Sequence, residues 1–86
     1  MRTVFAVLFC VASSSALASP HCTSEPSAKW LAPEVMKEKI MAMGHHIDVF
    51  KTTKGNCYEV YGKDRAGKSI EIYFDPVTGA IVEDVK

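Results

Sequence analysis

Hydrophobic residues recur with two different periods along this chain, and the change of period separates a predicted helix from a predicted sheet. Residues 33–43 space their apolar side chains three or four positions apart, as on one face of a helix. These apolar positions are Val35, Met36, Ile40 and Met43. Pro33 suits a first helical turn, and Gly44 suits the position just after a helix end. From His45 onward apolar and polar residues alternate, which predicts strands.

Turn residues divide the alternating region into four predicted strands. The first strand begins at His45, and the others are expected over 57–63, 70–74 and 80–85. The segment 64–68 is typical of a three-residue hairpin with Gly67 in the left-handed region. A second reversal is predicted at 75–79, where Pro76 presets φ and Gly79 allows a positive φ.

The turn assignments can be checked against the apolar pattern, because each one fixes which residues lie opposite one another. Pairing of Asp64 with Lys68, together with a four-residue loop over 53–56, puts most apolar strand residues on one face. This predicted inner face, which the helix should cover, carries Ile47, Val49, Tyr58, Val60, Ile70, Ile72 and Phe74. The predicted outer face carries Phe50, Cys57, Glu59, Tyr61, Glu71 and Tyr73. The fold class is therefore α+β, one helix packed on a three- to four-stranded antiparallel sheet.

The N-terminal segment has the pattern of a cleaved secretory signal peptide. One arginine precedes a nine-residue apolar run over 4–12, and Ala16-Leu17-Ala18 matches the small-x-small pattern of a cleavage site. Nine apolar residues are too few to cross about 30 Å of hydrocarbon, so stable membrane insertion after cleavage is not expected. We expect a signal peptide at 1–18, an arm at 19–31 and one domain at 32–86, exported from a bacterial cell to the periplasm or the medium.

Cleavage after Ala18 would remove Cys10 and leave Cys22 and Cys57. Two cysteines in an exported chain predict one disulfide, which would anchor the Ser- and Pro-rich arm on the outer side of the sheet. The arm has no hydrophobic period, so we expect it to be irregular and held by Cys22 alone. Two free thiols, or a metal-binding pair completed by His21, are the alternatives.

Charge and composition argue against several functional classes. Ten basic and ten acidic residues are interspersed, so no basic footprint for nucleic acid is present. We find no serine or cysteine nucleophile beside a base, and no phosphate-binding loop, so the chain is not expected to be an enzyme. His45 and His46 are adjacent, and neighbouring residues of a strand point to opposite faces. No metal site or cofactor is therefore predicted, although a small metal- or haem-handling protein using the histidines and methionines is an alternative function.

The predicted outer face is the candidate binding surface. Phe50, Glu59, Tyr61, Glu71 and Tyr73 interleave aromatic and acidic side chains, which suits recognition of a protein partner. The alternative is that these aromatics form ordinary cross-strand pairs, partly covered by the arm and Trp30.

Residues 30–86 resemble the small exported proteins of the PepSY domain family. The resemblance is carried by Trp30, Gly44, Gly55, Cys57-Tyr58-Glu59-Val60, Asp64, Gly67 and Tyr73-Phe74-Asp75-Pro76-Val77-Thr78-Gly79. It implies a helix on an antiparallel sheet and a non-catalytic role. PepSY domains occur in propeptides of thermolysin-type metalloproteases and in bacterial envelope and sensory proteins. The resemblance thus implies a module that binds and modulates a partner in the cell envelope, as a peptidase inhibitor or as a regulator of a sensor ectodomain.

Overall fold

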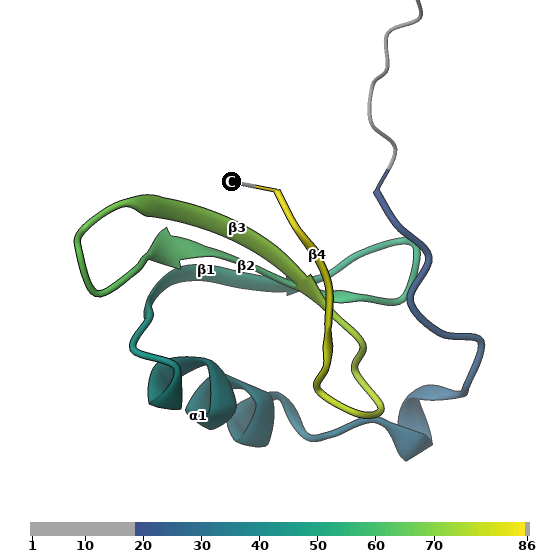
Figure 1. Ribbon diagram of the computed structural model, residues 1–86. Helices are drawn as coiled ribbons and strands as arrows, with labels where there is room; N and C mark the ends of the chain where they lie inside the picture. The colour runs from purple at the N-terminus through teal and green to yellow at the C-terminus, as the bar shows by residue number, and fades with distance from the viewer. Residues whose placement is uncertain (1–18, 86) are drawn as a thin grey trace, which may run out of the picture.

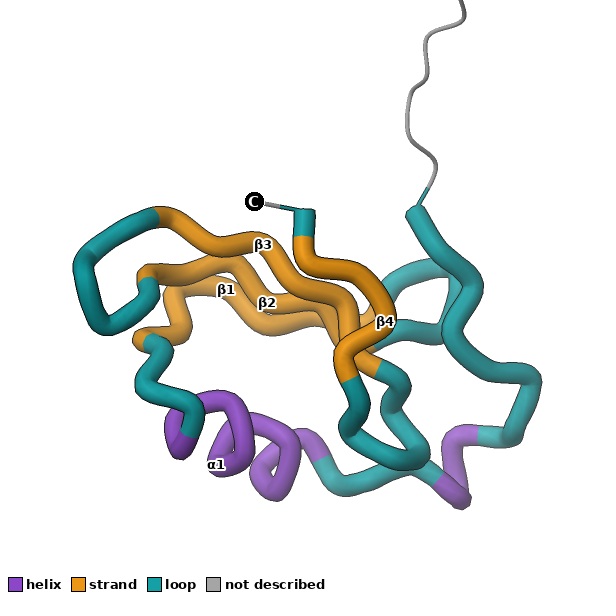
Figure 2. The backbone as a smooth tube through the Cα atoms, viewed as in Figure 1, coloured by secondary structure: helices purple, strands orange, loops and turns teal. Residues whose placement is uncertain are grey.

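The computed structural model describes residues 19–85, which form one helix and a four-stranded antiparallel sheet (Figures 1 and 2). The elements are the 3-10 turn η1 (Ser27–Lys29), the helix α1 (Pro33–Ala42), and the strands β1 (His46–Thr52), β2 (Tyr58–Lys63), β3 (Ser69–Phe74) and β4 (Ile81–Asp84). The strands lie side by side in chain order. This arrangement confirms the predicted α+β class. The predicted signal peptide lies outside the described residues.

The core lies between α1 and the inner face of the sheet, the face toward the helix (Figure 1). Met36 and Ile40, one helical turn apart, are fully buried, while the helix residues around them are exposed or half-buried. They pack in one cluster with Tyr58, Val60, Ile70, Ile72 and Phe74 of the strands. Burying a side chain of this size contributes about 1.5–3 kcal/mol. The helix and most of the predicted inner face are therefore confirmed, but only Met36 and Ile40 of the predicted apolar stripe are buried, since Val35 and Met43 are 44% and 41% exposed.

The hairpin between β2 and β3 has the predicted geometry. Asp64 N–H donates to the Lys68 carbonyl at 2.8 Å, and Gly67 N–H donates to the Asp64 carbonyl at 2.9 Å. Gly67 has φ +85°, the left-handed conformation that a bulge after a type I turn requires. The Asp64 carboxylate accepts the N–H groups of Ala66 and Lys68, both at 2.9 Å, and so fixes the turn from inside. Every β2–β3 pair follows the register that this turn predicts.

The reversal between β3 and β4 is also confirmed. Gly79 N–H donates to the Asp75 carbonyl at 2.7 Å, and Gly79 has φ +80°. The Asp75 carboxylate accepts the Val77 N–H at 2.8 Å, an Asx turn that preorganises the reversal. β4 then continues as an edge strand whose four residues are all exposed.

The predicted register between β1 and β2 is wrong over half of β1. The loop has three residues rather than four, because Thr53 N–H donates to the Cys57 carbonyl at 2.9 Å and Asn56 adopts φ +62°. Asparagine tolerates this left-handed conformation better than most residues do. A β-bulge between Ile47 and Val49 then restores the predicted pairing further along β1.

The consequence of the shortened loop is that residues 49–52, between the loop and the bulge, point to the faces opposite to those predicted. Phe50, predicted on the outer face, lies opposite Val60 and packs against the core. Val49, predicted on the inner face, lies opposite Tyr61 and is 47% exposed. Ile47 keeps its predicted partner, Gly62.

The arm at 19–31 wraps around one end of the sheet and is fastened at several points. It starts on the side away from α1, passes the β1–β2 loop and ends beside the helix (Figure 1). Leu31 N–H donates to the Pro76 carbonyl at 2.7 Å, and the Tyr58 hydroxyl donates to the Leu31 carbonyl at 2.7 Å. Trp30 packs edge-on against Tyr58 on the inner face. The expectation that Cys22 alone holds the arm is therefore wrong, as is the placement of Trp30 over the outer face.

Candidate functional site

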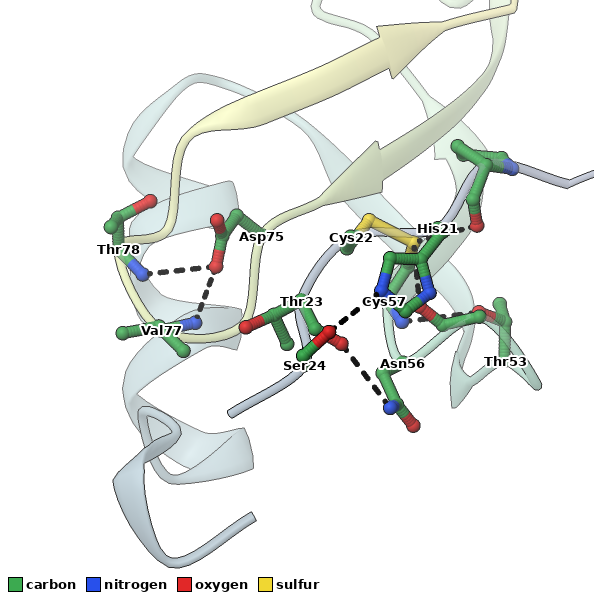
Figure 3. Close-up of a disulfide and its surroundings, with 12 residues drawn as sticks. His21, Cys22, Thr23, Ser24, Thr53, Asn56, Cys57, Asp75, Val77 and Thr78 are labelled. Atoms are coloured by element: carbon green, nitrogen blue, oxygen red, sulfur yellow. Dashed lines mark hydrogen bonds between the residues drawn. A yellow bond between two sulfur atoms is a disulfide. The ribbon is translucent and has the colours of Figure 1, made fainter. Parts of the chain in front are cut away.

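The disulfide between Cys22 and Cys57 joins the arm to the beginning of β2 (Figure 3). The two Cα atoms lie 5.0 Å apart, within the ordinary range for a disulfide, and Cys57 is fully buried. The predicted pairing is confirmed. Because oxidised cysteines are neither nucleophiles nor thiolate ligands, the bond also removes both sulfur atoms from thiol chemistry.

Backbone contacts beside the disulfide hold the arm against the β1–β2 loop. Cys22 N–H donates to the Gly55 carbonyl at 2.9 Å, and Asn56 Nδ2 donates to the Thr23 carbonyl at 3.3 Å (Figure 3). A Cβ atom on Gly55 would lie 2.2 Å from the Pro20 carbonyl oxygen, so only glycine fits there. The arm is thus seated on the loop independently of the covalent bond.

The outer face of the sheet consists of two neighbouring cross-strand rows. We call the row next to the arm the covered row; it consists of Lys51, Glu59, Tyr73 and Glu83. We call the next one the open row; it consists of Val49, Tyr61, Glu71 and Val85, the last placed by its N–H bond to the Glu71 carbonyl. Each of the four strands contributes one side chain to each row, except that Val85 is the residue directly after β4.

The covered row buries a carboxylate. Glu59 is only 3% exposed and Tyr73 only 8%, although neither faces the helix. Among the described residues, Glu59 Oε2 has no hydrogen-bond partner, and Oε1 lies 4.0 Å from Lys51 Nζ, too far for a hydrogen bond. Burial of a charge is expensive unless it is paired, so this carboxylate, whose nearest cation is the distant Lys51 ammonium, is only weakly compensated.

The open row, by contrast, presents half-exposed apolar side chains to solvent. Val49, Tyr61 and Val85 are 47%, 36% and 46% exposed. Lys51 Nζ lies 5.7 Å from the centre of the Tyr61 ring, within the range of a cation–π contact. The row is therefore apolar at both ends and carries a phenol and a carboxylate in its middle.

Carboxylates on this face raise the pKa of both tyrosines, Tyr61 and Tyr73. The Glu59 carboxylate, as hydrogen-bond acceptor and as negative charge, raises the pKa of Tyr61 to about 12, and Glu71 adds to the effect. Burial raises the pKa of Tyr73, and the neighbouring carboxylates add to the rise, while a hydrogen bond with the Ser19 side chain opposes it. Tyr73 also donates to Glu71 Oε2 at 3.4 Å. Both phenols therefore remain neutral donors at physiological pH.

The five residues that the sequence suggested for partner binding are not all brought together. Glu59, Tyr61, Glu71 and Tyr73 form a two-by-two block across β2 and β3, in which each glutamate lies opposite a tyrosine. Phe50 is on the other face, with its ring 5.0 Å from the Tyr58 ring and Lys37 Nζ 5.2 Å above it. Phe50 lies apart from this block because the shortened β1–β2 loop shifts the register and turns that side chain inward.

Val49 and Val85 are the residues of the open row that sequence reasoning missed. Val49 was assigned inward because the loop was counted as four residues. The signal that could have found it was Asn56, a residue type enriched in the left-handed position that ends a three-residue loop. For Val85 the pairing with Glu71 follows from the predicted reversal, but exposure of an edge residue does not follow from alternation alone.

The histidines are dispersed. His21 Nε2 lies 3.3 Å from the Ser24 hydroxyl, and His46 Nε2 lies 3.2 Å from the Asp48 carboxylate. The buried Nδ1 of His45 has no hydrogen-bond partner within residues 19–85. That same span contains no group of three or more His, Cys, Asp or Glu side chains placed to hold a metal ion. The alternative of a metal- or haem-handling protein thus gains no site from the described residues.

Comparison with known proteins identifies the family. Residues 2–85 match the family model PepSY_2, described as the peptidase propeptide and YPEB domain. Because the match covers nearly the whole chain, the protein belongs to this PepSY family, whose members are generally non-catalytic modules of propeptide or inhibitor type. No curated protein and no solved structure matches the chain. In the described part, no helix is long and apolar enough to span a membrane.

Proposed function

We propose that this PepSY chain is an exported, non-catalytic module that binds a protein partner and modulates its activity. Modules of this family commonly interact with proteins such as peptidases, and a peptidase is the first partner we propose. The ectodomain of an envelope sensor is the second. Export is supported by the signal-peptide pattern at 1–18, whose apolar run precedes a small-x-small cleavage pattern.

The observation that carries the proposal is the open row. Three half-exposed apolar side chains, Val49, Tyr61 and Val85, lie on one cross-strand row of the outer face. Tyrosine is enriched among the residues that contribute most to protein interfaces, because its ring contributes area and its hydroxyl contributes a hydrogen bond. The raised pKa of Tyr61 keeps that hydroxyl protonated as a donor.

A titration against a thermolysin-type metallopeptidase tests the proposal. The oxidised chain should inhibit the peptidase, and Tyr61→Ala should weaken inhibition at least tenfold, which corresponds to about 1.4 kcal/mol of binding free energy. Met41→Ala is the matched control, because Met41 is 53% exposed but lies on α1, away from the outer face. Val49→Ser is a second variant in the open row.

Two results would contradict different parts of the proposal. Equal inhibition by wild type and Tyr61→Ala would refute the open row as the binding surface. Absence of any complex, measured against both metallopeptidases and envelope sensor ectodomains, would refute the function itself.

A further inference from the structure

The buried Glu59 carboxylate has one positively charged neighbour among the described residues, Lys51, and that ammonium is too distant for a hydrogen bond. The Glu59 side chain is 4% exposed, and Oε2 has no hydrogen-bond partner. The side chains that face it are Lys51 on β1, Tyr61 on β2, Tyr73 and Glu71 on β3, and Glu83 on β4. This cluster therefore contains three carboxylates, Glu59, Glu71 and Glu83, and one lysine. The nitrogen of that lysine is 4.0 Å from Glu59 Oε1.

The first described residue of the arm, Ser19, lies near Tyr73 of the covered row. Pro20 lies against the β1–β2 loop, with its carbonyl oxygen 3.3 Å from Cys57 Sγ, a packing contact because the oxidised sulfur has no proton to donate. One residue earlier, the Ser19 side chain lies close enough to the Tyr73 hydroxyl to lower the pKa of Tyr73, and Tyr73 lies directly opposite Glu59. The arm therefore begins above the covered row.

Cleavage at the predicted site would change the charge of this residue. With residues 1–18 attached, the Ser19 nitrogen is a neutral peptide amide. Hydrolysis by a signal peptidase adds water across the Ala18–Ser19 bond, so that Ala18 leaves with a carboxylate and the Ser19 nitrogen becomes an amine that takes a proton. The resulting α-ammonium has three donors and an ordinary pKa of about 7.7–8.0.

We propose that Glu59, together with Tyr73 and Glu71, forms a receptor for the α-ammonium of Ser19, which only signal-peptide cleavage creates. Docking of this ammonium gives the buried carboxylate the charged donor it lacks. The mature N-terminus then lies fixed on the covered row, and the open row beside it stays uncovered. This receptor rests on the export and cleavage proposed above, but not on the identity of the protein partner.

Two chains test the receptor directly, because residues 19–85 contain every described element. One chain begins at Ser19, and the other carries one extra residue, Ala18, which displaces the ammonium. NMR titration should show the Ser19 α-amine pKa about one unit above its ordinary value, a tenfold higher proton affinity, and no such rise in the extended chain. An unshifted Ser19 amine would overturn the proposal.

Glu59→Gln should abolish the rise, and Glu38→Gln, an exposed carboxylate on α1, should leave it intact. An equal rise in Glu59→Gln would also overturn the proposal. If Glu59→Gln does not fold, acetylation of Ser19 provides the second test. The Glu59 carboxyl carbon should respond to titration of the amine in the free chain and not in the acetylated one, and an identical response would refute the contact.

Stability should follow the same titration. Because docking raises the folded-state pKa of the amine above its unfolded value, the stabilisation is present in full below about pH 7.7 and is lost as the pH rises through the folded value. The extended chain should lack this decline. Mass spectrometry of the exported protein should find Ser19 as its first residue, and a different first residue would overturn the proposal.

Discussion

The two faces of the sheet are built from the same strands but reach burial by different means. On the inner face, apolar side chains meet a helix that the chain places immediately before the strands. On the outer face, Glu59 and Tyr73 are buried as deeply, beside an arm that a disulfide fastens to Cys57. The inner face is therefore a hydrophobic core, and the outer face combines buried polar residues with half-exposed apolar ones. The difference separates the residues that specify the fold from those that stay exposed.

The largest effect should come from the inner face. Phe74→Ala removes a fully buried ring from the core cluster and should lower the free energy of unfolding by about 3–5 kcal/mol. Tyr61→Ala is the matched change on the outer face, and its partly exposed ring should cost no more than about 1 kcal/mol. Urea unfolding of both variants measures the contrast. Equal losses would show that the two faces do not differ as described.

The disulfide should come next, because it belongs to the arm rather than to the core. The double variant Cys22→Ala/Cys57→Ala should lose about 2–4 kcal/mol, mainly through the entropy of the open chain. Amide hydrogen exchange should then accelerate first in the arm and the β1–β2 loop, and last in β2 and β3. Uniform acceleration across the molecule would contradict the separation of arm and core.

The sequence predicts some of these parts of the molecule well and others poorly. The helix and both later turns follow from local signals, since Gly67 and Gly79 mark positions that need positive φ. The β1 register failed through one residue, Asn56, whose left-handed conformation shortened the loop and moved Phe50 inward. The burial of Glu59 was also missed, because alternation along a strand assigns a face and carries no information about which polar residues of that face are buried.

A smaller effect is expected where the arm meets the core. Tyr58→Phe removes only the hydroxyl that donates to the Leu31 carbonyl at 2.7 Å. The ring stays packed against Trp30, so the loss should be about 1–2 kcal/mol, the cost of a carbonyl left without its donor. Thermal unfolding of the variant measures it. A loss of unfolding free energy larger than that of Phe74→Ala would show that the arm contributes more to stability than the core, contrary to this comparison.

The smallest effect should lie in a turn that belongs to neither face. Backbone N–H groups of Lys68 and Ala66 hold the pKa of the Asp64 carboxyl below its ordinary value. A carboxyl with a depressed folded-state pKa stabilises the fold above its unfolded pKa of about 3.9, and the contribution is lost as pH falls through the folded value. Asp64→Asn should therefore flatten the acid limb of the curve of unfolding midpoint against pH. Glu38→Gln is the control, and an unchanged acid limb in Asp64→Asn would refute the role of this carboxylate.

The path of the arm has a consequence for the order in which the molecule is completed. Ribosomes make residues 19–31 before any strand exists, yet Cys22 needs Cys57, which is synthesised 35 residues later. The seat of the arm on Gly55 forms only when the β1–β2 hairpin has closed. The arm is thus synthesised first among the described residues but can be fixed in place last. In an oxidising compartment, the disulfide can form readily only in chains whose first hairpin is already in register.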